Sequence, residues 1–339
     1  MPSERRLRRV TRLRRSLACA AMLALVPLGG SAIAATDRAT LEQLRRGDVR
    51  LAAIGHRLAT GNAVLCDDRV PAIGLVVHAI DQYSADEQGD ARAIFGFDTA
   101  VAIEGVVPGS AAARAGIRPD ESIVSVNDRP IPRSDGAGHV HTRDSFVALL
   151  DAQPVDRPLR LTLRRAGRDR AVVVPPSPGC RSYFELRPGP ALDASADGVQ
   201  VQISGAFLDR FSDDQVAVVV AHELAHNILR HRRRLDAAGI SRGVFREFGR
   251  NGRLFRATED EADRLSVYLL RNAGWDPELA VRFWQGPGTR IAGGIFYSRT
   301  HSSPARRAEL IAQEIAALPA GAPIPYRPSL LARQDAPLR

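Results

Sequence analysis

The sequence of 339 residues contains no lysine, only three cysteines, and no apolar run after its first 34 residues that is long enough to cross a membrane. All 47 basic residues are therefore arginines, which indicates a GC-rich bacterial coding sequence rather than a function. Two cysteines, Cys66 and Cys180, lie outside the N-terminal segment, and neither is near another metal ligand in the sequence. A cysteine-based metal site is therefore not expected.

The first 34 residues explain most of the net charge of +9. They hold seven arginines and one glutamate, so the remainder carries 40 basic and 37 acidic residues and lacks the charge excess typical of nucleic-acid binding. An apolar stretch over residues 17–28 follows the arginines, and Ala32-Ile33-Ala34 comes after it. This order predicts a secretory signal peptide cleaved near Ala34 and a periplasmic mature protein. Cys19 lacks the leucine three positions earlier that a lipoprotein signal requires, so we expect no lipid anchor.

The most informative segment is His222-Glu223-Leu224-Ala225-His226, a match to H-E-x-x-H. On a helix, residues four apart lie on one face, so both imidazoles can bind one metal ion while Glu223 lies beside the open coordination position. Two metal ligands and a general base are the minimum for metal-assisted hydrolysis. Two surface histidines on an ordinary helix are the alternative, but composition alone predicts only about 0.01 such matches in a chain of this length.

The sequence around this motif predicts a helix. Residues 212–215 form a capping box with Ser212 as the N-cap, and apolar residues then recur at helical spacing through Ile228. Residues 218–220 alone would suit a buried strand, but the pattern continues without glycine or proline for about twenty residues, too long for one strand. We expect the helix to end in the basic segment 231–234 and interpret its arginines as a solvated helix end.

A third protein ligand is expected downstream, in residues 258–263. Thr258 and Glu261 form a second capping box, which predicts that a new helix begins here. Glu259 and Asp263 are four apart and share a face, which suits one carboxylate as a metal ligand and the other as the partner that orients a ligand imidazole. Alternatively, the acidic residues gather here only because they suit the helix dipole.

H-E-L-A-H followed by E-x-x-A-D resembles the zinc metallopeptidase family that includes the HtpX membrane proteases, the CAAX prenyl proteases and the periplasmic BepA-type proteases. Residues 300–307, T-H-S-S-P-A-R-R, are similar to that family's T-H-P-x-x-x-x-R segment, with the proline displaced to position 304. The resemblance covers about residues 180–318. It implies a zincin-type metallopeptidase domain with one Zn²⁺ per chain, held by His222, His226 and Glu259.

The same resemblance assigns roles to three further residues. Asp263 would orient a ligand, and Arg307 would pin the segment that carries His301. His301 would approach the metal, where it either stabilises the transition state or caps the zinc in a resting form. A polar loop residue without a role is the alternative for His301.

In this interpretation the protein hydrolyses peptide bonds. Glu223 takes a proton from the attacking water and later gives it to the leaving amine, while zinc and His301 stabilise the oxyanion. Just before the motif, residues 198–204 alternate apolar and polar side chains, which predicts a half-buried strand. In metallopeptidases of this design such a strand borders the cleft and pairs with the extended substrate, but an interior strand fits the pattern equally well.

Residues 108–131 belong to a different module. P-G-S-A-A-A-R-A-G-I, followed by P-D-E-S-I-V-S-V-N-D-R-P-I, resembles the core of bacterial PDZ domains, as in the HtrA proteases. Asp120-Glu121 and Asp128-Arg129 replace that family's Gly-Asp and Asn-Gly turns. Residues 159–174 predict a hairpin around Ala166-Gly167.

The resemblance to PDZ domains implies a binding function for this module. The carboxylate-binding loop would lie at Ile73, Gly74 and Leu75, and the groove beside it would take an extended or C-terminal peptide as an added strand. An inert spacer domain is the alternative. Cys66 and Cys180 flank the module, and in an oxidising periplasm we expect a disulfide between them that staples its two ends together.

Together these observations predict an α+β protein with a β-rich PDZ-like domain followed by a mainly helical metallopeptidase domain. A Pro-rich segment at 175–179 is the expected linker. The predicted parts are a signal peptide (1–34), a helical arm (35–66), the PDZ-like domain (67–177), the metallopeptidase domain (178–318) and a flexible tail (319–339).

Three functions fit this organisation. The first is a periplasmic zinc metalloendopeptidase whose PDZ domain recognises substrates or partners, with a role in envelope protein quality control. The second is a PDZ-based binding or chaperone-like scaffold with a resting or inactive peptidase site. The third is an exopeptidase or another H-E-x-x-H hydrolase. An aminopeptidase would need an acidic anchor for the substrate N-terminus, and the sequence displays no motif for one. Protein or peptide partners are expected, nucleic acid is not, and any association with the envelope would be peripheral.

Overall fold

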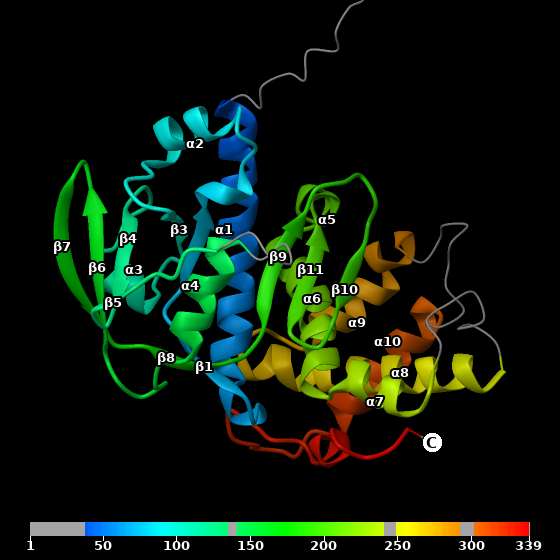
Figure 1. Ribbon diagram of the computed structural model, residues 1–339. Helices are drawn as coiled ribbons and strands as arrows, with labels where there is room; N and C mark the ends of the chain where they lie inside the picture. Colours follow the sequence, from blue (N-terminus) through cyan, green and yellow to red (C-terminus); the bar gives the residue numbers. More distant parts are fainter. Residues whose placement is uncertain (1–37, 135–140, 241–248, 292–301, 339) are drawn as a thin grey trace, which may run out of the picture. The chain divides into compact units, whose positions relative to one another are not determined.

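The computed structural model describes residues 38–134, 141–240, 249–291 and 302–338. Within residues 36–339, which form one compact unit, helices and small β-sheets are combined in the expected α+β manner (Figure 1). The predicted signal peptide lies outside the described residues. None of the described helices has both the length and the apolar character that crossing a membrane requires.

The first described element is the long helix α1 (Arg38–Gly61), where a helical arm is expected. Its apolar face is buried through Leu51, Ile54 and Leu58, whereas Leu44 remains 40% exposed. The helix contacts strand β3 (Val101–Val106) of one sheet, strand β9 (Tyr183–Arg187) of another, and helix α6 (Asp213–Ile228). A methyl group at Gly55 would overlap the ring of Phe184, so a residue without a side chain is needed for the close approach of α1 to β9.

The PDZ-like part is built on a six-stranded sheet with the order β2-β3-β4-β6-β7, to which β5 is added through β4. Every pairing in it is antiparallel. Its core contains Ile73, Ile103, Ile123, Leu161 and Phe146. Its elements are β2 (Leu75–Ala79), the 3₁₀ helix η2 (Ile80–Gln82), α2 (Gln88–Phe95), β3 (Val101–Val106), α3 (Ala111–Arg114), β4 (Ser122–Val126), β5 (Arg129–Pro130), α4 (Thr142–Asp151), β6 (Leu159–Arg165) and β7 (Arg168–Val174).

The unusual turn residues of this part adopt the conformations that glycines normally supply. Asp120 has φ +65°, and Asn127 and Asp128 have φ +48° and +62° between β4 and β5. Left-handed backbone is tolerated best by glycine, asparagine and aspartate, so these substitutions preserve the turns. The predicted hairpin is confirmed, with Ala166 and Gly167 both at positive φ between β6 and β7.

A two-stranded ladder joins the two ends of the PDZ-like part. Strand β1 (Arg69–Ala72) pairs with β8 (Ser177–Cys180), so half of the segment expected to be a linker forms a strand. Cys66, after the 3₁₀ helix η1 (Ala63–Leu65), is bonded to Cys180 across a sequence separation of 114 residues. The predicted linker was therefore partly wrong: Pro178 and Gly179 of β8 suit an edge strand of a two-stranded ladder, where few amides need a partner.

The metallopeptidase-like part combines a three-stranded sheet with six α-helices among the described residues. In the sheet, β11 (Gln200–Ser204) lies between β9 (Tyr183–Arg187), which is parallel to it, and the antiparallel β10 (Ala194–Ala196). The strand expected at 198–204 is thus interior, and the two edges belong to β9 and β10. The helices are α5 (Gly205–Arg210), α6 (Asp213–Ile228), α7 (His231–Ala237), α8 (Gly249–Asn272), α9 (Glu278–Gln285), the 3₁₀ turn η5 (Pro287–Arg290) and α10 (Pro304–Ala316).

Two helix boundaries differ from the predicted ones. Helix α6 ends at Ile228, because Arg230 adopts left-handed backbone (φ +55°) and a separate helix α7 starts at His231. Helix α8 does not start at Thr258, because it is already helical from Gly249, the first described residue of this segment. The hydroxyl of Thr258 bonds the carbonyl of Phe255 in the same helix. The arginine-rich first turns of α8 are helical because Leu254 packs against Leu235, Ile240 and Leu338.

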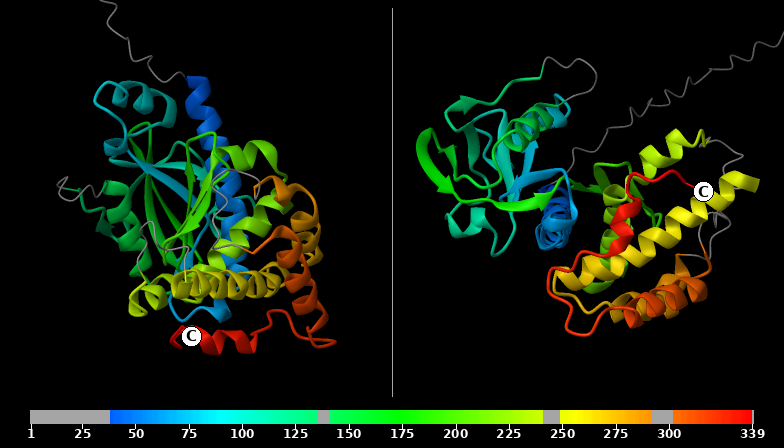
Figure 2. Two further views of the ribbon diagram at one scale, coloured as in Figure 1. Left: turned by 90° about the vertical axis from the view of Figure 1, so that its right-hand side faces the viewer. Right: turned by 90° about the horizontal axis from the view of Figure 1, so that it is seen from below.

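The C-terminal segment, for which the sequence predicts a flexible tail, packs along α7 and α8 up to residue 338 (Figure 2, right, red). It includes the 3₁₀ helix η6 (Ser329–Arg333), in which Leu330 and Leu331 are buried. Asp335 accepts hydrogen bonds from Arg230 at 2.6 Å and also bonds Arg233. The prolines that suggested a loose tail occur between these contacts, and two buried leucines contribute roughly 1.5–3 kcal/mol each.

Candidate active site

Helix α6 carries the H-E-x-x-H motif. The predicted capping box is present: the Ser212 side chain accepts from the Gln215 amide and the Gln215 side chain from the Ser212 amide. Most of the helix is buried, including Val216, Val220 and Leu224 at 0% exposure. Burial of each such side chain contributes roughly 1.5–3 kcal/mol, so α6 is a rigid support for its two histidines.

Helix α8 packs against α6 and brings a carboxylate to both histidines. The Nε2 atoms of His222 and His226 are 3.1 Å apart. The Glu259 carboxylate lies 3.2 Å from Nε2 of His222 and 3.5 Å from Nε2 of His226. Among the described residues, these three form the one group whose ligand atoms all lie within 4.8 Å of one another and could hold a metal ion.

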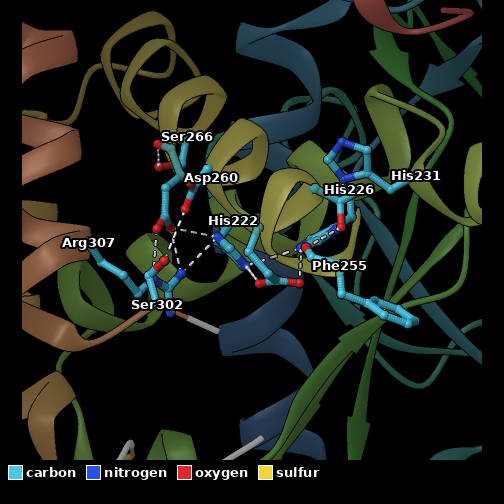
Figure 3. A network of polar contacts seen from close by, with 11 residues as sticks. His222, His226, His231, Phe255, Asp260, Ser266, Ser302 and Arg307 are labelled. Atoms are coloured by element: carbon cyan, nitrogen blue, oxygen red, sulfur yellow. Dashed lines mark hydrogen bonds and ion pairs between the residues drawn. The ribbon is translucent and has the colours of Figure 1, made fainter. Parts of the chain in front are cut away.

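The other face of His222 contacts Asp263, also on α8, and Arg307 from α10 (Figure 3). Asp263 Oδ1 is 2.9 Å from Nδ1 of His222, and Arg307 donates to both Asp263 oxygens at 2.7 and 2.5 Å. The Arg307 guanidinium also stacks on Trp284, 3.6 Å from the ring centroid. The sequence predicted both Asp263 and Arg307 as residues that support the ligands, and the structure places both beside His222.

These contacts determine how His222 presents its nitrogens. Asp263 is a full hydrogen-bond acceptor, because burial raises its pKa but Arg307 and His222 lower it further, to about 2. Neutral His222 therefore carries its proton on Nδ1 and directs the Nε2 lone pair toward His226 and Glu259. Burial and Arg307 lower the pKa of His222, but Asp263 and Glu259 outweigh them and raise it to about 9. The surroundings of the His222 imidazole therefore favour a positive charge at this position.

A second chain of contacts, which the sequence did not predict, supports His226. Nδ1 of His231 lies 2.9 Å from Nδ1 of His226 (Figure 3). Nε2 of His231 lies 3.2 Å from Glu261. Glu261 is also held by Arg234 at 2.7 Å and by Arg333 of the C-terminal segment at 3.3 Å. The basic segment expected as a solvated helix end thus has two buried residues, His231 and Arg234.

In the sequence, the spacing between His226 and His231 was the only signal for this set of contacts. His231 follows His226 by five residues and lies in a different helix, so no helical periodicity relates them. Glu261 seemed fully explained as a capping residue. Only the left-handed turn at Arg230, which redirects the chain, brings His231 back onto His226.

Glu223 lies one position along α6 from His222 and is half-buried. Within the part of the chain that the structure describes, its carboxylate forms no hydrogen bond or ion pair. Its negative charge contributes to raising the pKa of Arg307, which shows that it is near the buried ion pair of Asp263 and Arg307. A carboxylate with uncommitted oxygens at this position is able to accept a proton.

His301, the other residue predicted to be catalytic, lies outside the described residues. The chain that follows it is placed at the site: the Ser302 hydroxyl donates to Asp260 of α8 at 3.1 Å. Ser303 is the N-cap of α10, and Pro304 occupies the first turn of that helix. A proline is favoured there because its missing amide has no helical acceptor, which accounts for its place in this sequence.

The donor set suits a metal ion. Two imidazole nitrogens and one carboxylate converge, and the opposite nitrogen of each imidazole is already engaged by Asp263 or His231. Convergent lone pairs at about 3 Å repel one another unless a cation lies between them. Hydrolytic zinc sites commonly use two histidines and one carboxylate as ligands and leave the fourth coordination position open.

The residues predicted to bind a peptide C-terminus lie in a different cavity. Ile73, Gly74 and Leu75 connect β1 to β2, and Gly74 has φ +80°. The Gly74 carbonyl accepts from Val107, and the Ile73 carbonyl accepts from Ala112. The loop is therefore fixed at the end of β2, beside a cavity that α4 also borders.

Comparisons with known proteins find a PDZ domain and a partial similarity to a metalloendopeptidase. A family model described as a PDZ domain matches residues 103–165. A mitochondrial metalloendopeptidase, OMA1 of Arabidopsis thaliana, is 32% identical over 124 residues, which cover 30% of this chain and 24% of that protein. The chain thus matches about a quarter of the relative's length. A crystal structure of the HtrA3 PDZ domain bound to a phage-derived ligand covers 32% of this chain and 88% of that one, with 20% identity and a TM-score of 0.25.

Proposed function

We propose that this protein is a zinc-dependent metalloendopeptidase of the periplasm, related to the HtpX and BepA-type proteases, whose PDZ domain binds protein or peptide substrates. The observation that carries this proposal is the convergence of His222, His226 and Glu259, with uncommitted Glu223 on the same helix. The similarity to a metalloendopeptidase and the PDZ match support it. The predicted signal peptide supports the compartment, and a role in envelope protein quality control suits a peptidase that carries a binding module.

Each residue of the site then has a defined task. His222, His226 and Glu259 bind the metal, and Asp263 and His231 hold the Nδ1 side of the two imidazoles so that Nε2 of each is directed inward. When bound, zinc supplies Lewis acidity to the scissile carbonyl and to the attacking water. Glu223 accepts the proton of that water on its carboxylate and delivers it to the leaving amine nitrogen. Arg307 neutralises Asp263, so that the buried carboxylate stays ionised.

Removal of the metal tests this function directly. Casein cleavage by the mature protein is expected to disappear after treatment with a zinc chelator and to return when Zn²⁺ is added back in stoichiometric amount. Metal analysis is expected to find one zinc per chain before chelation and almost none after it. Cleavage that persists in a metal-free preparation would contradict the proposal, whereas bound zinc without cleavage would favour a binding scaffold with a resting site.

The contacts of His231 predict a specific effect on metal affinity. His226 can present Nε2 only if its Nδ1–H donates, and His231 Nδ1 is the acceptor at 2.9 Å. His231→Leu is expected to lower zinc affinity by about 10–100-fold, the usual effect of losing a partner that orients a ligand. His231→Asn keeps an acceptor oxygen close to the Nδ1 position and is expected to recover most of the loss. Competition with a chromogenic chelator measures both, and equal affinities of the leucine and asparagine variants would contradict the orienting role.

A further inference from the structure

The PDZ-like part borders a cavity of about 900 Å³ that the proposed metal site does not use. Strand β2 and helix α4 supply apolar walls, with Leu75 and Val77 on one side and Val147 and Leu150 on the other. Within the described residues, β2 pairs only with β3 and leaves its other edge without a strand partner. An extended peptide can add to such an edge and place alternate side chains into the groove.

Elements outside the PDZ-like part also line this cavity. Residues of α1 and of β9 border it. Two side-chain contacts hold β9 to α4: Arg143 forms an ion pair with Glu185 at 2.9 Å, and the Tyr183 hydroxyl donates to Asp151. A peptide bound along β2 would therefore meet side chains from α1 and β9 in addition to those of the groove itself.

Acidic side chains line the cavity from both sources. Asp48 of α1 and Glu185 of β9 belong to the additional walls, and Glu104 of β3 belongs to the PDZ-like sheet. Glu185 is paired with Arg143, and the Asp48 carboxylate accepts a hydrogen bond from the Leu186 amide. Glu104 is half-buried and, among the described residues, has no hydrogen bond or ion pair. It faces the cavity as a carboxylate without a partner.

The nearby cations are already engaged elsewhere. Arg45 of α1 bonds Asp120 at 2.5 Å and stacks on Phe95, and Arg143 of α4 is shared between Asp144 and Glu185. The remaining titratable neighbours of Glu104 are Asp48 and Tyr83 after η2, and Glu185 on β9 acts in turn on Asp48. Burial and Asp48 raise the pKa of Glu104 to about 8, and burial and Glu185 raise that of Asp48 to about 6. Without a ligand, the cavity therefore disfavours the ionised forms of Glu104 and Asp48.

A metal ion does not suit these carboxylates. Among the described residues, only the cluster of His222, His226 and Glu259 has three ligand atoms close enough to share one ion. A cationic side chain on a flexible stem can instead reach Glu104 and Asp48 individually. The apolar groove can hold the rest of the ligand.

We infer that the cavity binds an extended peptide carrying a lysine or arginine side chain, which forms an ion pair with Glu104 and Asp48 while the peptide backbone lies along β2. The inference rests on the peptide-binding role proposed for the PDZ domain and adds the chemistry of the preferred ligand. The ion pair is formed with Glu104 ionised, so binding of the basic peptide releases a proton from Glu104 below about pH 8. Its advantage over a neutral peptide therefore grows as the pH rises.

The experiment uses the mature chain with Glu223→Gln, which prevents cleavage during the measurement. Fluorescein-labelled ten-residue peptides on an alanine frame with a C-terminal valine carry either lysine or norleucine at one of the last six positions. Fluorescence anisotropy at pH 9 is expected to show at least about tenfold tighter binding of the lysine peptide at one position. This preference is expected to fall as the pH is lowered through 8 to 6.

Two variants identify the carboxylates, and a third controls for general charge. Glu104→Gln removes a charge that the free protein disfavours, so it is expected to fold at least as stably and to abolish the lysine preference without weakening norleucine peptides. Asp48→Asn is expected to reduce the preference in part. Asp90→Asn, on the exposed surface of α2, is expected to leave it unchanged.

The possible results separate this inference from the proposed peptide-binding role. Lysine and norleucine peptides that bind equally at every position, with no effect of Glu104→Gln, would overturn the inference and leave peptide binding intact. Absence of binding by every peptide would overturn both.

Discussion

Replacement of Glu223 by glutamine is expected to lower kcat/KM for casein-derived peptides by about 10²–10⁴-fold, the usual contribution of a general base, while bound zinc stays at one per chain. The amide has nearly the shape of the carboxylate but cannot accept the proton of the attacking water. The metal content of the variant should not change, because Glu223 is not among the three residues whose ligand atoms converge. Helix α6 should also keep its stability, since Glu223 has no hydrogen bond among the described residues.

Two measurements make this result decisive. Metal analysis of the purified variant shows whether the site is still loaded, and a fluorogenic peptide assay gives the change in kcat/KM. Asp214→Asn, on the same helix but in its first turn, serves as the control for a changed carboxylate and should cleave at the wild-type rate. A loaded Glu223→Gln variant that cleaves peptides at the wild-type rate would show that another group transfers the proton.

The part of the site that could be predicted from the sequence is the part set by local spacing. Ser212 and Gln215 cap α6 because their separation of three residues is enough to define the contact. His222 and His226 face one way because they are one helical turn apart. Glu259 and Asp263 share a face for the same reason, although the predicted start of their helix at Thr258 was wrong.

The error at Thr258 has a physical cause. A capping residue and a mid-helix residue can have the same sequence signature, and only packing distinguishes them. Leu254 is buried against Leu235 and Ile240, which extends α8 toward its N-terminus through arginine-rich turns that seem solvated in the sequence. Glu261 therefore lies inside α8 and does not cap it, and its carboxylate binds His231 and Arg234.

The position of the C-terminal segment could not be predicted either, because it depends on contacts between residues far apart in the sequence. Asp335 pairs with Arg230, more than one hundred residues earlier, and Arg333 reaches Glu261. Local composition in this segment is rich in proline and carries no periodic pattern. The contacts with Arg230 and Glu261 place it directly behind the chain of residues that supports His226.

Replacement of Glu259 by alanine is expected to cause the largest loss of metal. The variant keeps both imidazoles but removes the carboxylate whose oxygens approach both Nε2 atoms, at 3.2 and 3.5 Å. Two protein ligands bind zinc much more weakly than three, so affinity should fall by more than the 10–100-fold that follows the loss of an orienting partner such as His231. Chelator competition places the two variants on one scale.

The neighbouring carboxylate provides a matched control for this experiment. Asp260→Asn changes the adjacent residue of α8, which contacts Ser302 rather than the histidines, and should retain one zinc per chain. Circular dichroism distinguishes loss of metal from loss of the fold, and Glu259→Gln offers a variant of nearly unchanged volume. Because the two imidazole lone pairs would still face each other at about 3 Å, the alanine variant should relax by admitting a proton between them rather than by unfolding. Full zinc content in a folded Glu259→Ala protein would place the third ligand elsewhere and would remove Glu259 from the proposed site.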